Sequence, residues 1–366
     1  MTKALYVHVP FCDKICAYCD FVRVLSHPLL IKDYLSALKS ELETYPLVQY
    51  ETIYIGGGTP SALSVEELTV LCEILAPISK SVIEYTMEVN PESLTLDKVM
   101  VMKKYGINRV SLGVQTFDEH ELKLLHRSHH KEDILKAMDL LIPNGITNIS
   151  IDLIYGLPLQ TLASFEHSIH EAFKCPITHL SLYSLTIEPN SEFGRQKVKK
   201  VSDEMEELMY FKAIELFKGY GFHQYEISNF THHLPSRHNM TYWHYNDYIG
   251  IGPGAVSLYQ NQRIENTKNL MEYFKGHYHS DVLNLSNEEQ RYEFLMMGLR
   301  VKEGISLQTF ENRFKESINV HYGESIDKLI KKGWLEIEND HLKATESGYP
   351  LLNTVLGELL DETTCN

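Results

Sequence analysis

Three cysteines stand close together near the start of the chain, at Cys12, Cys16 and Cys19. Their C-x-x-x-C-x-x-C spacing lets three thiolates wrap one compact metal centre. A structural zinc site usually has four ligands, and no fourth cysteine lies nearby. Three thiolates suit a 4Fe–4S cluster with one iron left open to bind and reduce a ligand. The spacing therefore favours a cluster, and a zinc knob or three unlinked thiols are the alternatives.

A run of three glycines, Gly56-Gly57-Gly58, follows a short apolar stretch and precedes Thr59 and Pro60. Without side chains, such a backbone can approach a ligand closely and offer its amides as hydrogen-bond donors. No Gly-Lys-Ser/Thr follows, so the run is not a Walker phosphate loop. A run of glycines alone usually forms a tight turn. It indicates a ligand site only in combination with the upstream cysteines.

Four polar residues lie at or just beyond the ends of later apolar runs, namely Glu88, Gln115, Arg127 and Asp152. Charges inside apolar strands are costly unless they are paired or functional. The functional interpretation is that these side chains line a ligand site. The structural alternative, for Glu88 and Asp152, is a salt bridge to Arg109 or Arg127.

A further candidate is the segment His238-Asn239-x-x-Tyr242-Trp243. Imidazole is a common axial ligand of haem iron, and aromatic side chains can pack on a porphyrin face. The alternative is a hydrogen-bonded corner of the core, which is the commoner role of a histidine beside Tyr and Trp. The sequence contains no C-x-x-C-H, so c-type haem attachment is unsupported.

The cysteine spacing resembles the signature of the radical S-adenosylmethionine superfamily. The flanking segments, Tyr6-Val7-His8-Val9-Pro10-Phe11-Cys12 and Tyr18-Cys19-Asp20-Phe21, resemble one branch of it. That branch contains oxygen-independent coproporphyrinogen III oxidase and a related haem chaperone. The glycine run with Thr59 and Pro60 resembles the superfamily's methionine-binding GGGTP loop, and the likeness extends over most of the chain.

The resemblance implies two sets of cofactor contacts around a 4Fe–4S cluster held by the three cysteines. Residues that match contacts of S-adenosylmethionine are Tyr6, Gly57, Gly58, Thr59 and Glu88. Residues that match positions near a second S-adenosylmethionine of the oxidase are Tyr18, Gln115, Arg127 and Asp152. The implied chemistry is one-electron cleavage of S-adenosylmethionine to a 5′-deoxyadenosyl radical, with the protein supplying orientation and excluding water.

One departure separates the two members of the branch. The oxidase has a fourth cysteine two residues after the third, and Phe21 stands there in this chain. Phe21 and the His238–Trp243 segment resemble the haem chaperone, which implies a haem-binding protein that hands haem to acceptor proteins, membrane haemoproteins among them. The alternative is an enzyme that decarboxylates coproporphyrinogen III, so the sequence leaves open whether the chain turns over any substrate. A zinc-bound docking protein is a third hypothesis.

The elements that must position these residues alternate between strand-like and helix-like stretches. The expected strands are Leu5–Val9, Thr52–Ile55, Glu84–Val89, Arg109–Val114, Ile149–Ile154 and Leu180–Ile187. The expected helices are Leu30–Leu42, a helix from a capping box at Ser64 to about Ile78, Leu96–Tyr105, Ile134–Ile142, Phe165–Phe173 and Glu204–Phe217. Nearly all-apolar strands indicate parallel strands buried on both faces. Glycines after three helices, Gly106, Gly145 and Gly219, suit helix ends.

Six such units predict an α/β fold in residues 1–230. Eight units would make a full TIM barrel. The resemblance implies the incomplete, six-unit barrel typical of radical enzymes, and an open doubly wound sheet is the alternative. Both folds place functional residues at the carboxyl ends of the strands.

Beyond the barrel, residues 231–285 read as a connecting segment, in which Gly250–Gly254 is a loop or turn. Just before it, Gln224–Phe230 reads as a further strand. Residues 286–366 resemble a mostly helical, winged-helix-like module. Its expected elements are helices at Glu288–Leu299, Leu307–Phe314, Ile326–Lys332 and Tyr349–Leu360, and strands at Leu335–Ile337 and His341–Ala344.

The length, net charge and cysteine positions exclude several classes of protein. A chain of 366 residues can bury a large core, and its net charge of −15 argues against nucleic acid as a partner. The start shows no signal peptide and no apolar run is long enough to span a bilayer, so we expect a cytoplasmic protein. The remaining cysteines, Cys72, Cys175 and Cys365, are scattered, which is unlike a disulfide framework. A homo-oligomer is compatible with the sequence.

Overall fold

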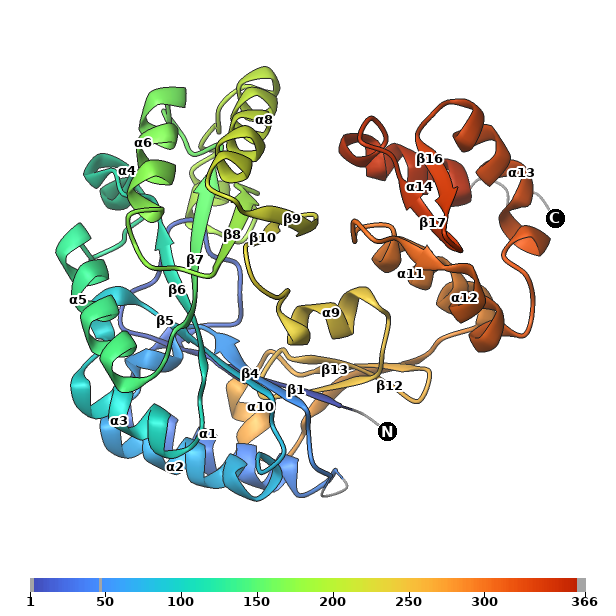
Figure 1. Cartoon of the computed structure of the whole chain (residues 1–366). Helices are drawn as coiled ribbons and strands as arrows, with labels where there is room; N and C mark the ends of the chain where they lie inside the picture. The colour runs from blue at the N-terminus through green and yellow to red at the C-terminus, as the bar shows by residue number, and fades with distance from the viewer. Residues whose placement is uncertain (1–2, 46–47, 361–366) are drawn as a thin grey trace.

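The computed structural model describes residues 3–45 and 48–360, and one sheet of twelve strands organises these ranges (Figure 1). In spatial order its strands are β14 (His279–Asn284), β13 (Gln262–Asn266), β12 (Val256–Tyr259), β11 (Tyr248–Ile251), β1 (Ala4–Val9), β4 (Thr52–Gly57), β5 (Glu84–Val89), β6 (Arg109–Gln115), β7 (Asn148–Tyr155), β8 (His179–Ser184), β10 (Asn229–Thr231) and β9 (His223–Glu226). Cys365 lies outside the described residues.

Helices connect the strands from β1 to β8 and lead from β8 to β9. They are α1 (Pro28–Leu42), α2 (Val65–Leu75), α3 (Leu96–Lys104), α4 (Glu119–Leu124), α5 (Lys131–Leu141), α6 (Leu162–Ala172), α7 (Glu192–Arg195) and α8 (Asp203–Gly219). Short 3₁₀ turns are η1 (Pro60–Ala62), η2 (Ala76–Ile78), η3 (Pro91–Ser93) and η4 (Ile142–Asn144), and a small parallel pair is β2 (Phe11–Cys12) with β3 (Val24–Leu25). Figure 1 shows the larger helices along the outer side of the curved sheet.

The strands β1, β4, β5, β6, β7 and β8 are parallel and follow each other in chain order. A doubly wound sheet reverses its strand order at a switch point, whereas this order runs in one direction only. Right-handed crossovers then place all the connecting helices on one side. The predicted incomplete barrel of six units is therefore confirmed.

Local signals in the sequence explain several element ends. The Ser64 hydroxyl accepts from the Glu67 N–H at 3.2 Å, and the Glu67 carboxylate accepts from the Ser64 N–H at 2.8 Å, which confirms the capping box. Gly145 closes the turn after α5 in the left-handed region, with φ 89°. The end of α8 was predicted wrongly, because Gly219 is still helical and Gly221 takes the left-handed conformation, with φ 79°.

The predictions for two stretches after residue 222 were also wrong. Gln224–Phe230, expected as one strand, is the hairpin of β9 and β10, which are antiparallel with a bulge. Gly250 and Ile251, expected in a loop, belong to β11, which pairs parallel to β1. Gly250 is needed there because a Cβ atom would lie 2.3 Å from the Val256 carbonyl oxygen of β12. The glycines at 250, 252 and 254 and Pro253 are typical of a loop, which concealed the strand.

Residues 231–285, expected as a connection, therefore extend the barrel sheet by four strands. They also form α9 (Arg237–Trp243) and α10 (Leu270–Phe274). The last strand, β14, is exposed along its whole length at the edge of the sheet. The three-part division of the chain stays a prediction, but the middle part is structured as a continuation of the barrel.

The C-terminal module matches the predicted order of helices and hairpin. Its elements are α11 (Asn287–Gly298), β15 (Ile305–Ser306), α12 (Leu307–Phe314), α13 (Asn319–Lys331), β16 (Leu335–Glu338), β17 (His341–Ala344), η5 (Tyr349–Leu351) and α14 (Leu352–Leu360). The three short strands form an antiparallel sheet in the order β15, β17, β16, as in a winged helix. Its hydrophobic core also takes in Tyr245 and Leu258 of the preceding segment, which ties the module to the sheet.

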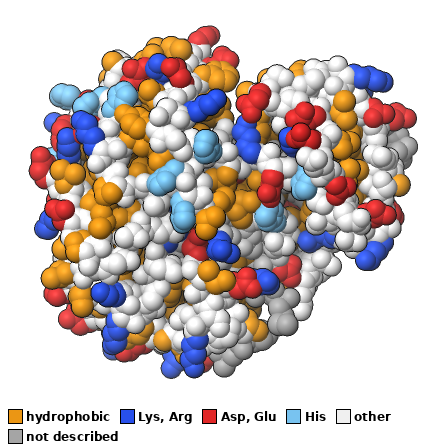
Figure 2. Space-filling model, viewed as in Figure 1, with side chains coloured by type: hydrophobic (Ala, Val, Ile, Leu, Met, Phe, Trp, Pro, Cys, Tyr) orange, Lys and Arg blue, Asp and Glu red, His pale blue; other side chains and the backbone are white. Residues whose placement is uncertain are grey.

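The surface in Figure 2 carries acidic and basic side chains interspersed over the face shown. No helix among residues 3–45 and 48–360 combines the length and the apolar character needed to cross a bilayer.

Candidate functional site

The three cysteines lie beyond the carboxyl end of β1. Cys12 ends the short strand β2 and is 6% exposed, whereas Cys16 and Cys19 follow in the next loop and are half-buried. The Cys19 N–H donates to the Cys16 carbonyl at 3.3 Å and closes a turn in the loop. All three cysteines line the same cavity. All three thiols are free. Burial raises the pKa of Cys12 to about 11, so its thiolate forms readily only on a metal.

These cysteines line a cavity of about 370 Å³, here called the cysteine cavity, at the carboxyl ends of the barrel strands. The predicted site residues on its wall are Cys12, Cys16, Tyr18, Cys19, Gly57, Gly58, Thr59, Glu88, Gln115, Arg127 and Asp152. Parallel strands bring these residues together because their carboxyl ends share one edge. Tyr6 is the exception, since it lies on a neighbouring cavity and its hydroxyl is 3.0 Å from Nδ1 of His8.

The glycine run packs directly against the cysteine loop. Gly57 has φ 112°, and a Cβ atom there would lie 2.6 Å from the ring of His8. At Gly58, a Cβ atom would lie 2.8 Å from the Phe11 carbonyl oxygen and 3.0 Å from Sγ of Cys12. The protein itself therefore requires glycine at both positions. The backbone that remains lines the cavity without side chains.

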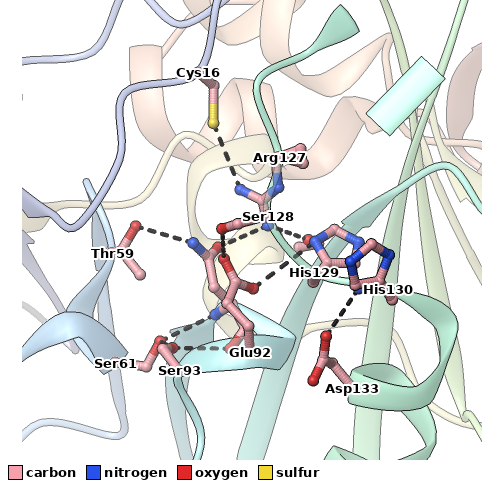
Figure 3. A network of polar contacts seen from close by, with 12 residues as sticks. Cys16, Thr59, Ser61, Glu92, Ser93, Arg127, Ser128, His129, His130 and Asp133 are labelled. Carbon is pink, nitrogen blue, oxygen red and sulfur yellow. Dashed lines mark hydrogen bonds and ion pairs between the residues drawn. The ribbon is translucent and has the colours of Figure 1, made fainter. Parts of the chain in front are cut away.

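A chain of hydrogen bonds joins two of the cysteines around the cavity. Thr59 donates from Oγ1 to Sγ of Cys12 at 3.6 Å, and Asn90 donates to Thr59 at 3.4 Å. Arg127 donates from Nη2 to Oδ1 of Asn90 at 2.9 Å and from Nη1 to Sγ of Cys16 at 3.6 Å. Figure 3 shows the guanidinium of Arg127 pointing to Cys16. The chain of hydrogen bonds places the positive charge of Arg127 beside the sulfur of Cys16.

Two carboxylates face the same cavity. Glu88 accepts from the Tyr54 hydroxyl at 2.8 Å and from the Gly57 N–H at 3.0 Å, and Asp152 accepts from Ser111 at 3.0 Å. Burial raises the pKa of Glu88 to about 7, and burial also raises the pKa of Asp152.

The structural alternative of a salt bridge to Arg109 or Arg127 is not what the structure shows. Among the described residues, neither Glu88 nor Asp152 forms an ion pair with either arginine. A buried carboxylate without a cation is costly. The two carboxylates therefore suit a ligand that brings positive charge, such as an ammonium or a sulfonium group.

Gln115 is held in an uncommon backbone conformation. It has φ 69° at the end of β6, where the pairing with β7 shifts register between Gly113 and Gln115. A left-handed residue that is not glycine stores strain, and such strain concentrates at ligand sites. The bulge places Gln115 on the wall of the cysteine cavity.

The residues present fit a cluster better than a zinc ion. Within the described ranges, no three His, Cys, Asp or Glu side chains converge on a point where one metal ion could sit. A zinc ion would draw its thiolates to about 2.3 Å from one atom. A 4Fe–4S cluster instead distributes three thiolates over three irons. Cys72 and Cys175 are buried elsewhere, in α2 and after α6.

His238, the haem candidate, lies in the core and not in an open site. Its side chain is 1% exposed, and both ring nitrogens are engaged: Nδ1 lies 2.9 Å from the Thr52 hydroxyl and Nε2 lies 2.7 Å from the Tyr242 hydroxyl. The ring also stacks on Tyr54 at 5.2 Å. Burial, followed by the charge of Arg109, lowers the pKa of His238 to about 3. The imidazole has no free nitrogen for iron, so the alternative of a hydrogen-bonded core corner describes it better.

Tyr242 and Trp243 do reach open space. With Tyr6, they line a second cavity of about 550 Å³, here called the aromatic cavity, between the sheet and α11. Asp20 and Phe21 line both cavities, so this segment is their shared wall. Phe21 is 67% exposed.

Several residues that line the cysteine cavity were not predicted from the sequence. They are Tyr54, Asn90, Ser111 and Tyr183. Asn90 follows Glu88 at the end of β5, so its place after a strand was a usable signal. Tyr54, Ser111 and Tyr183 lie within strands, where the sequence cannot tell an inward residue from an outward one.

Two family models match the chain. The radical SAM superfamily model covers residues 6–172, and the HemN C-terminal domain model covers residues 285–351. A radical SAM domain implies a 4Fe–4S cluster and S-adenosylmethionine, and the first match spans the cysteine loop and the strands from β1 to β7. A radical SAM domain followed by a HemN C-terminal domain is thus the domain order of this chain.

Similar proteins extend along the whole chain. The heme chaperone HemW of Bacillus subtilis (strain 168) is 34% identical, with 98% of this chain and 100% of that protein covered. HemW of Lactococcus lactis is 36% identical over 98% of this chain and 97% of that protein. The solved structure of coproporphyrinogen III oxidase (HemN) from Escherichia coli matches with a TM-score of 0.86, over 99% of this chain and 90% of that one. At 22% identity that match concerns the fold alone.

Sequence and structure agree on the relationship. The HemW proteins are more than 30% identical over almost the full length, and the cysteine motif, the glycine loop and the partial barrel are those of a radical SAM domain. The chain therefore belongs to the HemW family of the radical SAM superfamily.

Proposed function

We propose that this protein is a haem chaperone built on a radical SAM scaffold. It binds a 4Fe–4S cluster, S-adenosylmethionine and haem, and delivers haem to haemoproteins, membrane-bound acceptors among them. The haem-handling part of the proposal is supported by the names of the HemW relatives. The cytoplasmic location expected from the sequence stays a prediction.

The observation that carries the cofactor part is the convergence of eleven predicted residues on one cavity. Cys12, Cys16 and Cys19 are the proposed cluster ligands. The Gly57–Gly58 backbone, which packs against the cysteine loop, and Glu88, which accepts from the Gly57 N–H, are the proposed partners of the amino-acid end of S-adenosylmethionine. When bound, the cluster and S-adenosylmethionine supply one-electron chemistry, and the apolar strands around them exclude water.

Within that cavity, the remaining residues hold or position the charged parts. Asp152 accepts a hydrogen bond from Ser111 and Glu88 accepts one from Tyr54, and neither carboxylate forms an ion pair within the described residues, which suits the sulfonium and ammonium groups. Thr59 and Arg127 donate hydrogen bonds to two of the thiols. Tyr18 and Gln115 complete the wall as proposed cofactor contacts.

The alternative is the oxidase, an enzyme that decarboxylates coproporphyrinogen III. The fold match to HemN is compatible with it. Phe21 argues against it, because this exposed phenyl ring stands where the oxidase has a fourth cysteine, on the wall that the two cavities share.

The test is two anaerobic incubations of the reconstituted protein. In one, haem is titrated and followed by absorption. In the other, coproporphyrinogen III, S-adenosylmethionine and a reductant are supplied, and protoporphyrinogen is assayed. We expect stoichiometric haem binding and no decarboxylation. Robust decarboxylation without haem binding would restore the oxidase assignment.

A further inference from the structure

The aromatic cavity has the size and the wall of a ligand site. Its volume of about 550 Å³ lies within the usual range for small-molecule pockets, and its lining is mostly apolar. Tyr242 and Trp243 of α9 and Tyr248 of β11 form one side, and Tyr242 and Tyr248 meet edge to face at 4.5 Å between ring centroids. Phe21 stands exposed at the border with the cysteine cavity. A flat, apolar ligand would find aromatic surface here.

Among the imidazole and thioether groups on the wall of this cavity, which are the usual axial ligands of haem iron, two thioethers remain available. His8 is the one histidine on the described wall, and its ring is engaged on both sides: Nε2 donates to the Val22 carbonyl at 2.8 Å, and Nδ1 accepts from Tyr6. The wall phenols are protonated at neutral pH, since burial raises the pKa of Tyr6 and of Tyr248. The thioethers of Met296 and Met297, on α11, carry no proton and line the cavity. Methionine sulfur is an established axial ligand of haem iron.

The cavity also has unpaired partners for carboxylates. The Trp243 indole N–H is buried and has no hydrogen-bond acceptor among the described residues. Lys268 lies on the wall, is exposed, and forms no ion pair within the part of the chain that the structure describes. Arg263 is less available, because its guanidinium donates to Glu293 at 2.8 Å. A buried N–H donor without an acceptor is costly, and a propionate oxygen would satisfy it.

We infer that the aromatic cavity is the haem site, with a thioether of Met296 or Met297 on the iron and with Trp243 and Lys268 on the propionates. The inference rests on the proposed haem-chaperone function and assigns it a place. It moves the iron ligand from the buried His238 to α11, the first helix of the C-terminal module. Haem then lies beside the cysteine cavity, separated from it by Asp20 and Phe21.

The test is a haem titration of the full chain, followed by absorption and by the near-infrared sulfur-to-iron band of the ferric form. Wild type is compared with the double variant Met296→Leu/Met297→Leu, which keeps the side-chain volume. We expect the double variant to lose the sulfur-to-iron band and to bind haem at least roughly tenfold more weakly. The control is Met271→Leu, because Met271 is 58% exposed on α10, and it should titrate like wild type.

The propionate contacts are tested with Trp243→Phe and Lys268→Gln. Each should weaken haem binding several-fold, and each effect should vanish with haem dimethyl ester, which lacks the carboxylates. A structural role of Trp243 would weaken both ligands equally. Wild type that binds haem while the double methionine variant keeps the same spectrum and affinity would overturn the site. Wild type that binds no haem would instead overturn the proposed function itself.

Discussion

Nη1 of Arg127 lies 3.6 Å from Sγ of Cys16, while Nη2 of the same guanidinium holds Asn90 and the Gly113 carbonyl. A cation that donates to a cluster thiolate stabilises the reduced, more negative cluster. We therefore predict that Arg127→Gln lowers the one-electron reduction potential of the reconstituted cluster. The shift should be about 60 mV, which corresponds to about 1.4 kcal/mol. Spectroelectrochemistry measures it directly.

The control for this charge effect is Arg195→Gln, because Arg195 lies on the surface of α7 and donates to the Asn190 carbonyl. Its potential should equal that of wild type. An Arg127→Gln protein with full iron content and an unchanged reduction potential would show that the guanidinium only holds Asn90 and the Gly113 carbonyl in place.

The cluster should depend on three cysteines and no others. Replacing any one of Cys12, Cys16 or Cys19 with Ala should abolish the brown chromophore, because two thiolates cannot hold the cube. Cys72→Ala and Cys175→Ala should keep it, since both side chains are buried away from the cysteine cavity. Iron and sulfide analysis after reconstitution measures this, and full iron in Cys16→Ala would refute the assignment.

Glu88 gives the cysteine cavity a pH dependence near neutrality. Burial raises its pKa to about 7, so the carboxylate that attracts a cationic ligand forms only as the pH passes that value. Affinity for S-adenosylmethionine should rise between about pH 6 and about pH 8, by up to about tenfold. Glu88→Gln should bind weakly and show no rise. Calorimetry that gives parallel profiles for both proteins would contradict the role of Glu88.

The same pKa makes an opposite prediction for stability without ligand. Because the folded-state pKa is raised above the ordinary 4.5, the folded protein holds this proton more tightly than the unfolded chain. That contribution is complete below the ordinary value and is lost as the pH rises through about 7. Glu88→Gln should therefore gain on the order of 1 kcal/mol relative to wild type at alkaline pH. Urea unfolding at two pH values measures the difference.

His238 should act on folding. From α9 its ring contacts Thr52 of β4 and its backbone N–H donates to Glu84 of β5 at 2.9 Å, while its other ring nitrogen lies beside Tyr242 of the same helix. His238→Ala should destabilise the protein by about 2–4 kcal/mol, because it leaves a cavity and two hydroxyls without a partner. Chemical denaturation measures this, with His233→Ala as an exposed control. An unchanged midpoint for His238→Ala would mean that the ring is not part of the core.

Much of the barrel was predictable because its strands are buried on both faces and read as continuous apolar runs. Glu84–Val89 was predicted with its observed bounds, and the Ser64 capping box fixed the start of α2. The strand β11 was missed because Gly250 opens the stretch Gly250–Gly254, whose glycines and proline are typical of a loop, and the close approach of Val256 that requires Gly250 cannot be read from the sequence. The pairing partner that makes it a strand, β1, is more than two hundred residues away in the chain.

The site shows the same division between local and distant information. Polar residues in the carboxyl-terminal halves of strands, such as Gln115 at the end of β6 and Asp152 within β7, were found because the carboxyl ends of parallel strands share one edge. Tyr6, predicted as an S-adenosylmethionine contact, lies on the wall of the aromatic cavity, and the sequence could not show which cavity a residue within β1 faces. The sequence left His238 open between a haem ligand and a hydrogen-bonded core corner, and only the tertiary structure places Thr52 and Tyr242 on its two nitrogens.

The wall formed by Asp20 and Phe21 belongs to two cavities at once. A ligand that moves this segment in one cavity changes the free energy of binding in the other. Thermodynamic reciprocity then requires the second ligand to change the affinity of the first by the same factor. A protein built this way can sense, through two residues that directly follow Cys19, whether its cofactor is loaded before it accepts or releases its cargo.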